Sequence, residues 1–184
     1  MPPLKDLLQG KYIVCSCEGH AEQAVVDLLL DSRRLCFRRE DLIGGECTQI
    51  RKGAHLAREF LNMETEKDIA IVRVLDRPKE KLVLPKIYEM RGDIQTFNIV
   101  TQPEIEILHI IDEGLFEKFR HQRDLKKPSA YCKRHIAQTK QKQIKSREFI
   151  CRRYEGNLDR LAAAIRRYRA LVSQEDYCLA DLLC

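Results

Sequence analysis

A short apolar run that ends in Glu18-Gly19 and leads straight into a helical pattern constrains the fold of this chain more than any other feature. The run covers Lys11–Cys17, and apolar residues at helical spacing follow in Ala21–Asp31. This order predicts a strand, a tight turn and a helix, as in open α/β sheets, where ligand sites gather at the carboxyl ends of the strands. Glu18 would stand at that end, with Glu22 one helical turn later on the same side. A carboxylate at this place is a candidate ligand for a hard cation such as Mg²⁺.

The same alternation continues along the first two thirds of the chain. Apolar runs at Asp68–Leu75 and Ile94–Val100 predict two more strands, and two shorter strand candidates lie at residues 35–37 and 47–50. Helical patterns are found at residues 4–8, 52–62, 82–90 and 104–120. Strands that alternate with helices favour a mostly parallel sheet flanked by helices, so we expect an α/β fold.

No strand signal is found after residue 120. Residues 128–138, 144–153 and 158–171 have helical patterns, and Ser173 with Asp176 is typical of the cap of a last helix through Leu183. We therefore expect two parts, which are an α/β domain over residues 1–119 and a basic helical section over residues 120–184 that packs on it.

The length and composition indicate a soluble globular protein. The chain has 184 residues, a length that is enough for one domain with a substantial core. Of these residues 44% are hydrophobic and 33% charged, as is usual for a globular protein. No apolar run approaches the ~20 residues that a membrane span needs. The segment Met1–Asp6 lacks the basic-then-apolar pattern of a secretory signal. We expect a cytoplasmic location and no membrane partner.

The eight cysteines are expected to be reduced thiols that behave as small hydrophobic residues. They stand at positions 15, 17, 36, 47, 132, 151, 178 and 184, and the absence of a CxxC pair rules out the usual zinc-ribbon spacing. Cys15 and Cys17 alternate with Ser16 on a predicted strand, so both would point to one face of the sheet. Cys132-x-x-His135 is the one metal-like spacing, and it lacks a second half.

The charge is distributed unevenly between the two parts. Residues 1–119 carry 17 basic and 21 acidic side chains, for a net charge of −4, whereas residues 120–184 carry 16 basic and 7 acidic side chains, for +9. This asymmetry favours a basic section that meets a polyanion such as nucleic acid. The residues that we expect to contact phosphates are Lys133, Arg134, Lys140, Lys142, Lys145, Arg152 and Arg153. The alternative is a solvated helical face that binds nothing.

Two aromatic residues in the basic section, Tyr131 and Tyr154, would add stacking on single-stranded bases. Sequence-specific DNA recognition is not supported, because the sequence contains no helix-turn-helix or zinc-finger signature.

Acidic residues follow each of the three clear strands. Glu18 follows the first, Asp76 the second, and Glu104 and Glu106 the third. If the strands are parallel and adjacent, these groups converge on one edge of the sheet, where their mutual repulsion is naturally compensated by a cation. Taken one at a time, each acid has a simpler explanation, as a solvated turn residue or as a partner of a helix dipole.

At these residues the chain resembles the Toprim (topoisomerase–primase) superfamily, and within it is most similar to the RloB-like branch that is linked to restriction and anti-phage defence loci. The resemblance covers about residues 11–119 and depends on the order of three motifs. The matching segments are Glu18-Gly19-His20-Ala21-Glu22, Val74-Leu75-Asp76-Arg77-Pro78 and Thr101-Gln102-Pro103-Glu104-Ile105-Glu106-Ile107-Leu108.

The resemblance implies roles for three acids, Glu18, Asp76 and Glu106. Glu18 would be the general acid/base, a role that favours a raised pKa. Asp76 and Glu106 would bind Mg²⁺ or orient its ligands, with Glu22 as a further candidate ligand. The chain departs from the family at Pro78, where the family has the second Asp of Asp-x-Asp, and Glu80 or Asp93 would have to substitute. Ile105 and Leu108 stand where the family has an aromatic residue and a Trp.

Three functions follow as hypotheses. The first is Mg²⁺-dependent cleavage of a nucleic-acid phosphodiester in a defence-type Toprim-like protein, with a restriction or defence-system protein as an expected partner. The second is a catalytically inactive Toprim-like module that binds nucleic acid or a partner. The third is a small scaffold subunit whose basic helices bind an acidic partner.

Overall fold

The fold is built on a four-stranded, all-parallel sheet in the order β1-β2-β3-β4. The computed structural model describes residues 1–77, 80–122, 127–136, 144–171 and 175–184. The strands are β1 (Tyr12–Cys17), β2 (Ile69–Leu75), β3 (Ile94–Val100) and β4 (Tyr177–Cys178). Every residue of β2 is buried, as its nearly unbroken apolar sequence requires for a central parallel strand. The predicted α/β fold with a mostly parallel sheet is confirmed.

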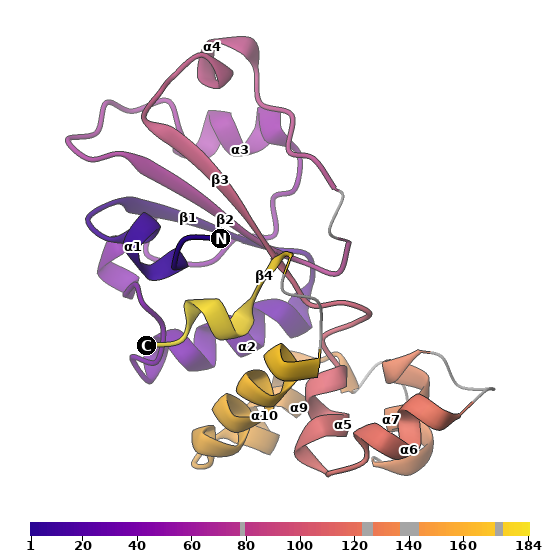
Figure 1. Cartoon of the computed structure of the whole chain (residues 1–184). Coiled ribbons are helices and arrows are strands. Elements are labelled where there is room, and N and C mark those ends of the chain that lie inside the picture. Colours follow the sequence, from indigo (N-terminus) through magenta and orange to yellow (C-terminus); the bar gives the residue numbers. More distant parts are fainter. Residues whose placement is uncertain (78–79, 123–126, 137–143, 172–174) are drawn as a thin grey trace.

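Helices cover both faces of this sheet (Figure 1). The helices are α1 (Leu4–Leu8), α2 (His20–Asp31), α3 (Gly53–Phe60), α4 (Lys86–Glu89), α5 (Ile107–Asp112), α6 (Phe116–His121), α7 (Pro128–His135), α9 (Arg147–Tyr154) and α10 (Leu158–Leu171), with 3₁₀ turns at Arg39–Asp41 and Leu179–Leu182. The larger core joins one face of the sheet to α2, α5, α7, α9 and α10, and the smaller core joins the other face to α3. None of these helices, in the part of the chain described, has the length and apolar character needed to cross a bilayer.

The C-terminal segment differs from its prediction. Instead of a last capped helix through Leu183, the chain forms β4, whose Cys178 pairs with Val100 of β3, and then a 3₁₀ turn. A strand of two residues has no periodicity of its own, so only its pairing with β3 defines it. The C-terminal section thus supplies one edge of the sheet.

Three further predictions need correction. The helix expected over 104–120 is divided into α5 and α6, because Gly114 adopts a positive φ of 69° and ends α5. The helix expected over 82–90 shrinks to α4, which begins only after Pro85. The segments at 35–37 and 47–50 make single bridges, Leu35 with Leu183 and Thr48 with Ser16, rather than strands.

Candidate functional site

Glu18 and Asp76 lie side by side at the carboxyl edge of the sheet. Cys17 of β1 pairs with Val74 of β2 in parallel register, so the residues that follow both strands emerge at the same edge. The Glu18 N–H donates to the Val74 carbonyl at 2.9 Å, and the Asp76 N–H donates to Glu18 Oε2 at 2.9 Å. The structure therefore brings these two candidate residues together.

The two carboxyl groups of this pair have opposite pKa shifts. Burial raises the pKa of Glu18, but hydrogen bonds from the Asp76 backbone and side chain, together with the charge of Arg51, outweigh burial and leave that pKa lowered. The pKa of Asp76 is raised, first by burial and then by its hydrogen bond with the Glu18 carboxylate and by repulsion from it. The pair therefore holds a proton preferentially on Asp76, and the raised pKa expected for Glu18 is not found.

Glu106 is a buried carboxylate, and neither of its oxygens has a hydrogen-bond partner among the described residues. Its side chain stands just before α5 and is 1% exposed. Burial raises the pKa of Glu106 to about 7, although the Lys145 ammonium, 3.6 Å from its Oε1, opposes the shift. The same ammonium lies 3.6 Å from Glu104, which also accepts a hydrogen bond from the Ser129 N–H at 2.9 Å. Lys145, predicted to bind phosphate, is thus placed among acids.

Glu22 links these two groups electrostatically. It lies in the first turn of α2, and its pKa is raised by burial and by the charges of Glu18 and Asp76, while Lys145 lowers it. The preceding Gly19 has an extended φ of −151°, and a Cβ there would meet Glu22 Oε2 at 3.1 Å. We call the five carboxyl groups the acidic edge, which comprises Glu18, Glu22, Asp76, Glu104 and Glu106.

Three charged residues beside the acidic edge were not predicted as a group. Arg51 contacts Glu18 Oε1 at 3.0 Å and donates to Glu80 Oε2 at 2.5 Å. Arg73, in the middle of β2 and 3% exposed, donates to Glu80 Oε1 at 2.7 Å. An arginine inside a buried apolar strand needs a carboxylate partner. Arg73 was therefore the sign in the sequence that an acidic residue contacts β2. Glu80 is therefore engaged by two guanidinium groups.

Asp93, the other proposed substitute for the missing aspartate at Pro78, lies at the wrong edge of the sheet. It precedes β3, whereas the acidic edge follows the strands, and it pairs with Arg91 at 2.6 Å. Asp93 cannot complete this site. Pro78 itself lies outside the described residues.

The basic residues that we predicted to bind phosphate fall into different environments. Lys133 and Arg134 are exposed on α7. Arg152 is exposed and pairs with Glu148, whereas Arg153 is only 15% exposed and bridges Asp112 and Glu113. Lys140 and Lys142 lie outside the described residues.

The stacking role expected of Tyr131 and Tyr154 is wrong. Their side chains are 1% and 0% exposed, because α7 and α9 turn them into the larger core, so neither ring has a face open to a base.

The acids do not gather as tightly as a set of cysteines does. Within the described ranges, one group of three or more cysteine, histidine or acidic residues has all its ligand atoms within 4.8 Å of one another, and that group is Cys15, Cys17 and Cys47. Mg²⁺ needs only one or two carboxylates because it retains several waters, so the looser acidic edge still offers a suitable donor set.

Comparison of the chain with models of known protein families, with curated proteins and with solved structures finds no match. Membership of the Toprim superfamily therefore stays a prediction from the three motifs.

Proposed function

We propose that this protein cleaves nucleic-acid phosphodiesters with Mg²⁺ at the acidic edge. The observation that carries the proposal is the contact between Glu18 and Asp76 at the carboxyl ends of neighbouring parallel strands. Ligand sites of open α/β sheets gather at this edge. The opposite pKa shifts of the two carboxyl groups are a further mark of a functional pair, since such shifts concentrate at sites that move protons.

The donor chemistry of the acidic edge suits Mg²⁺. Within the described part of the chain, both oxygens of Glu106 and Oδ1 of Asp76 are buried without a hydrogen-bond partner. An unsatisfied buried carboxylate oxygen calls for a cation or a proton. Asp76 would hold the ion together with Glu22 or Glu106, and retained waters would complete its coordination. Bound there, Mg²⁺ would offset the charge that develops on the phosphate and make bound water more acidic.

The chain's own contribution to the reaction is proton transfer at Glu18. Because its pKa is lowered, Glu18 is ionised at neutral pH and accepts the proton of the attacking water as the new P–O bond forms. The same carboxyl group then returns that proton to the leaving oxygen as the old P–O bond breaks. Arg51, 3.0 Å from Oε1, and the Asp76 N–H, on Oε2, fix the carboxylate in place.

The test is cleavage of labelled single- and double-stranded DNA and RNA with Mg²⁺ or Mn²⁺. Glu18→Gln is nearly isosteric and cannot exchange a proton, so we expect it to lower the rate about 10²–10⁴-fold while nucleic-acid binding is retained. Glu66→Gln, at an exposed position between α3 and β2, is the matched control and should cleave like the wild type. Equal rates for Glu18→Gln and the wild type would refute the assigned role.

A second function is favoured by the cations that already face the acids. Arg51 contacts Glu18, and Lys145 lies beside Glu104 and Glu106, so much of the negative charge is neutralised without a metal. The second candidate is therefore a module that binds nucleic acid or a partner protein without cleaving it. This function would be selected if the wild type cleaves no substrate under any of the conditions above and still binds nucleic acid in a salt-dependent way.

The proposed biological setting rests on the sequence. A defence role, a restriction-system partner and a cytoplasmic location are carried into this proposal from the resemblance and the composition.

A further inference from the structure

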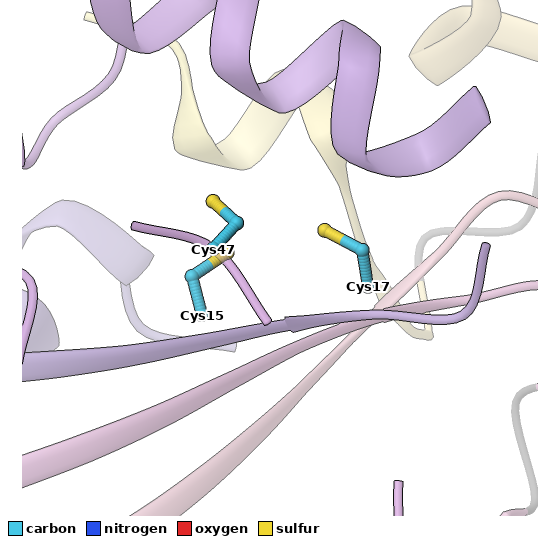
Figure 2. A group of neighbouring side chains, drawn as sticks. All are labelled: Cys15, Cys17 and Cys47. Carbon is cyan, nitrogen blue, oxygen red and sulfur yellow. The ribbon is translucent and has the colours of Figure 1, made fainter. Parts of the chain in front are cut away.

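Three cysteine thiols meet in the layer between the sheet and α2. Cys15 and Cys17 rise from the same face of β1 toward the helix, and Cys47 comes from a neighbouring segment (Figure 2). Their sulfur atoms all lie within 4.8 Å of one another. All three are free thiols, and their residues are 1%, 0% and 6% exposed.

The backbone holds Cys47 in this position. Thr48, the next residue, donates from its N–H to the Cys15 carbonyl at 2.8 Å and accepts from the Cys17 N–H at 2.8 Å. Gln23 of α2 donates to the Cys47 carbonyl at 3.0 Å. The segment is thus attached to β1 on both sides of Ser16 and to α2, so the three thiols are brought together by ordered backbone and not by loose side chains.

We propose that Cys15, Cys17 and Cys47 bind one thiophilic metal ion, Zn²⁺ or Cu⁺, at a site separate from the acidic edge. Soft thiolate ligands select these ions, whereas Mg²⁺ prefers oxygen. A Zn–S bond is about 2.3 Å long, so an ion bound equally by three sulfurs needs them about 4 Å apart. From the observed upper limit of 4.8 Å, each sulfur has to move by well under the length of one bond.

The environment explains how the ion would reach the site and how the thiols would lose their protons. A pocket of about 370 Å³, lined by Gln23, Asp27, Arg39, Gly45, Glu46 and Arg147, reaches Glu46, the neighbour of Cys47. Cys47 is the least buried of the three cysteines, and hydrogen bonds from the Cys15 and Cys17 thiols lower its pKa. Binding displaces the remaining thiol protons to solvent, so affinity rises with pH.

The two ions make different demands on the site. Zn²⁺ is usually four-coordinate and would take a water or an external ligand beside the three sulfurs. Cu⁺ needs no fourth ligand in a three-thiolate site. Both arms of the experiment are therefore required to decide between them.

The full chain is reduced, stripped with a chelator, loaded anaerobically with one equivalent of Zn²⁺ or Cu⁺ and desalted. Elemental analysis and native mass spectrometry then report the retained metal. We expect one ion per chain for at least one of the two metals. At a denaturant concentration that exposes the buried thiols of the metal-free protein, the loaded protein should also resist alkylation at Cys15, Cys17 and Cys47, while labelling of the partly exposed Cys36 and Cys151 stays the same with and without metal.

Two variants sharpen the test. Cys47→Ser should reduce retained metal to near zero, while Cys178→Ser, which alters another buried cysteine, in β4, should retain one ion per chain. The proposal fails if the wild type retains neither metal, if Cys47→Ser retains as much as the wild type, or if alkylation of the three cysteines is unaffected by metal. A Cys15–Cys47 disulfide in freshly purified protein that takes up no metal after reduction would likewise overturn it. The alkylation result needs no variant, so a misfolded Cys47→Ser does not block the decision.

Discussion

Replacing Glu106 by glutamine should make the protein more stable, and increasingly so as the pH rises. Glu106 is 1% exposed and neither of its oxygens accepts a hydrogen bond from any residue that the structure describes, so its ionised form is held in a poorly solvated site. Glutamine has nearly the same shape and carries no charge. The substitution removes the cost of burying the charge and also the attraction of Lys145, and the net rise of the Glu106 pKa means that the cost is the larger of the two.

The pKa of Glu106 sets the size of the effect. It is about 7 in the folded protein, against 4.5 for an ordinary glutamate. Between these values the folded protein binds more protons than the unfolded chain, so the free energy of unfolding falls as the pH rises from about 4.5 to about 7. A difference of about 2.5 pKa units corresponds to about 3 kcal/mol. Below pH 4.5 Glu106 is protonated in both the folded and the unfolded protein, so it no longer makes the free energy of unfolding depend on pH.

The assay is urea unfolding of the wild type and Glu106→Gln at several pH values from 4.5 to 8, with a chelator present to exclude divalent ions. We expect the variant's advantage to be smallest at pH 4.5 and to grow by about 3 kcal/mol by pH 8. Glu66→Gln, whose side chain is exposed, should show no such trend. An advantage of Glu106→Gln that does not change with pH would refute the reasoning, because it would mean that Glu106 titrates normally.

Three further outcomes are expected. Arg153→Ala should lower the free energy of unfolding by about 1–3 kcal/mol, because it removes one of the two guanidinium groups that hold the buried Asp112 carboxylate while Arg160 remains, whereas Arg152→Ala on the same helix should change it little; urea unfolding at pH 7 measures both. Charge reversal at Lys133 and Arg134 should reduce the slope of log affinity against log salt by about two for nucleic acids of any sequence, and an unchanged slope in a binding titration would remove α7 from the interface. Lys145→Gln should tighten Mn²⁺ binding about tenfold or more in calorimetry, because the ammonium competes with the ion for the same carboxylates; weaker binding would contradict this.

The sequence was most informative where local pattern and fold agree. The unbroken apolar run of β2 predicted a central strand, and parallel strands necessarily share an edge, so the meeting of Glu18 with Asp76 could be foreseen. Pairing between segments that lie far apart in the sequence could not be foreseen. The strand β4 has two residues and exists only because it binds β3, so it was mistaken for part of a helix.

The same limit explains what was missed in the two sites. Glu80 reaches Arg51 and Arg73 from a separate segment, and the sequence gives no sign of that contact beyond the odd arginine in a buried strand. Cys47 joins Cys15 and Cys17 only because Thr48 pairs with β1. A spacing of two residues predicted a shared face for the first two cysteines, while the third is brought in by tertiary structure.

The charge balance of the acidic edge links the two candidate functions. Among the described residues, the five carboxyl groups face three cations, Arg51, Arg77 and Lys145. The remaining charge is reduced by protons, since the pKa values of Asp76, Glu22 and Glu106 are all raised. Raised carboxyl pKa values are expected of a metal site without its metal, because protons bind to the carboxyl groups that would otherwise bind a divalent ion. A permanently inactive site would look the same. The two differ in reversibility, because only a working site releases those protons when Mg²⁺ is added. Proton release on Mg²⁺ addition near pH 7, absent in Asp76→Asn, therefore separates them without any assay of cleavage.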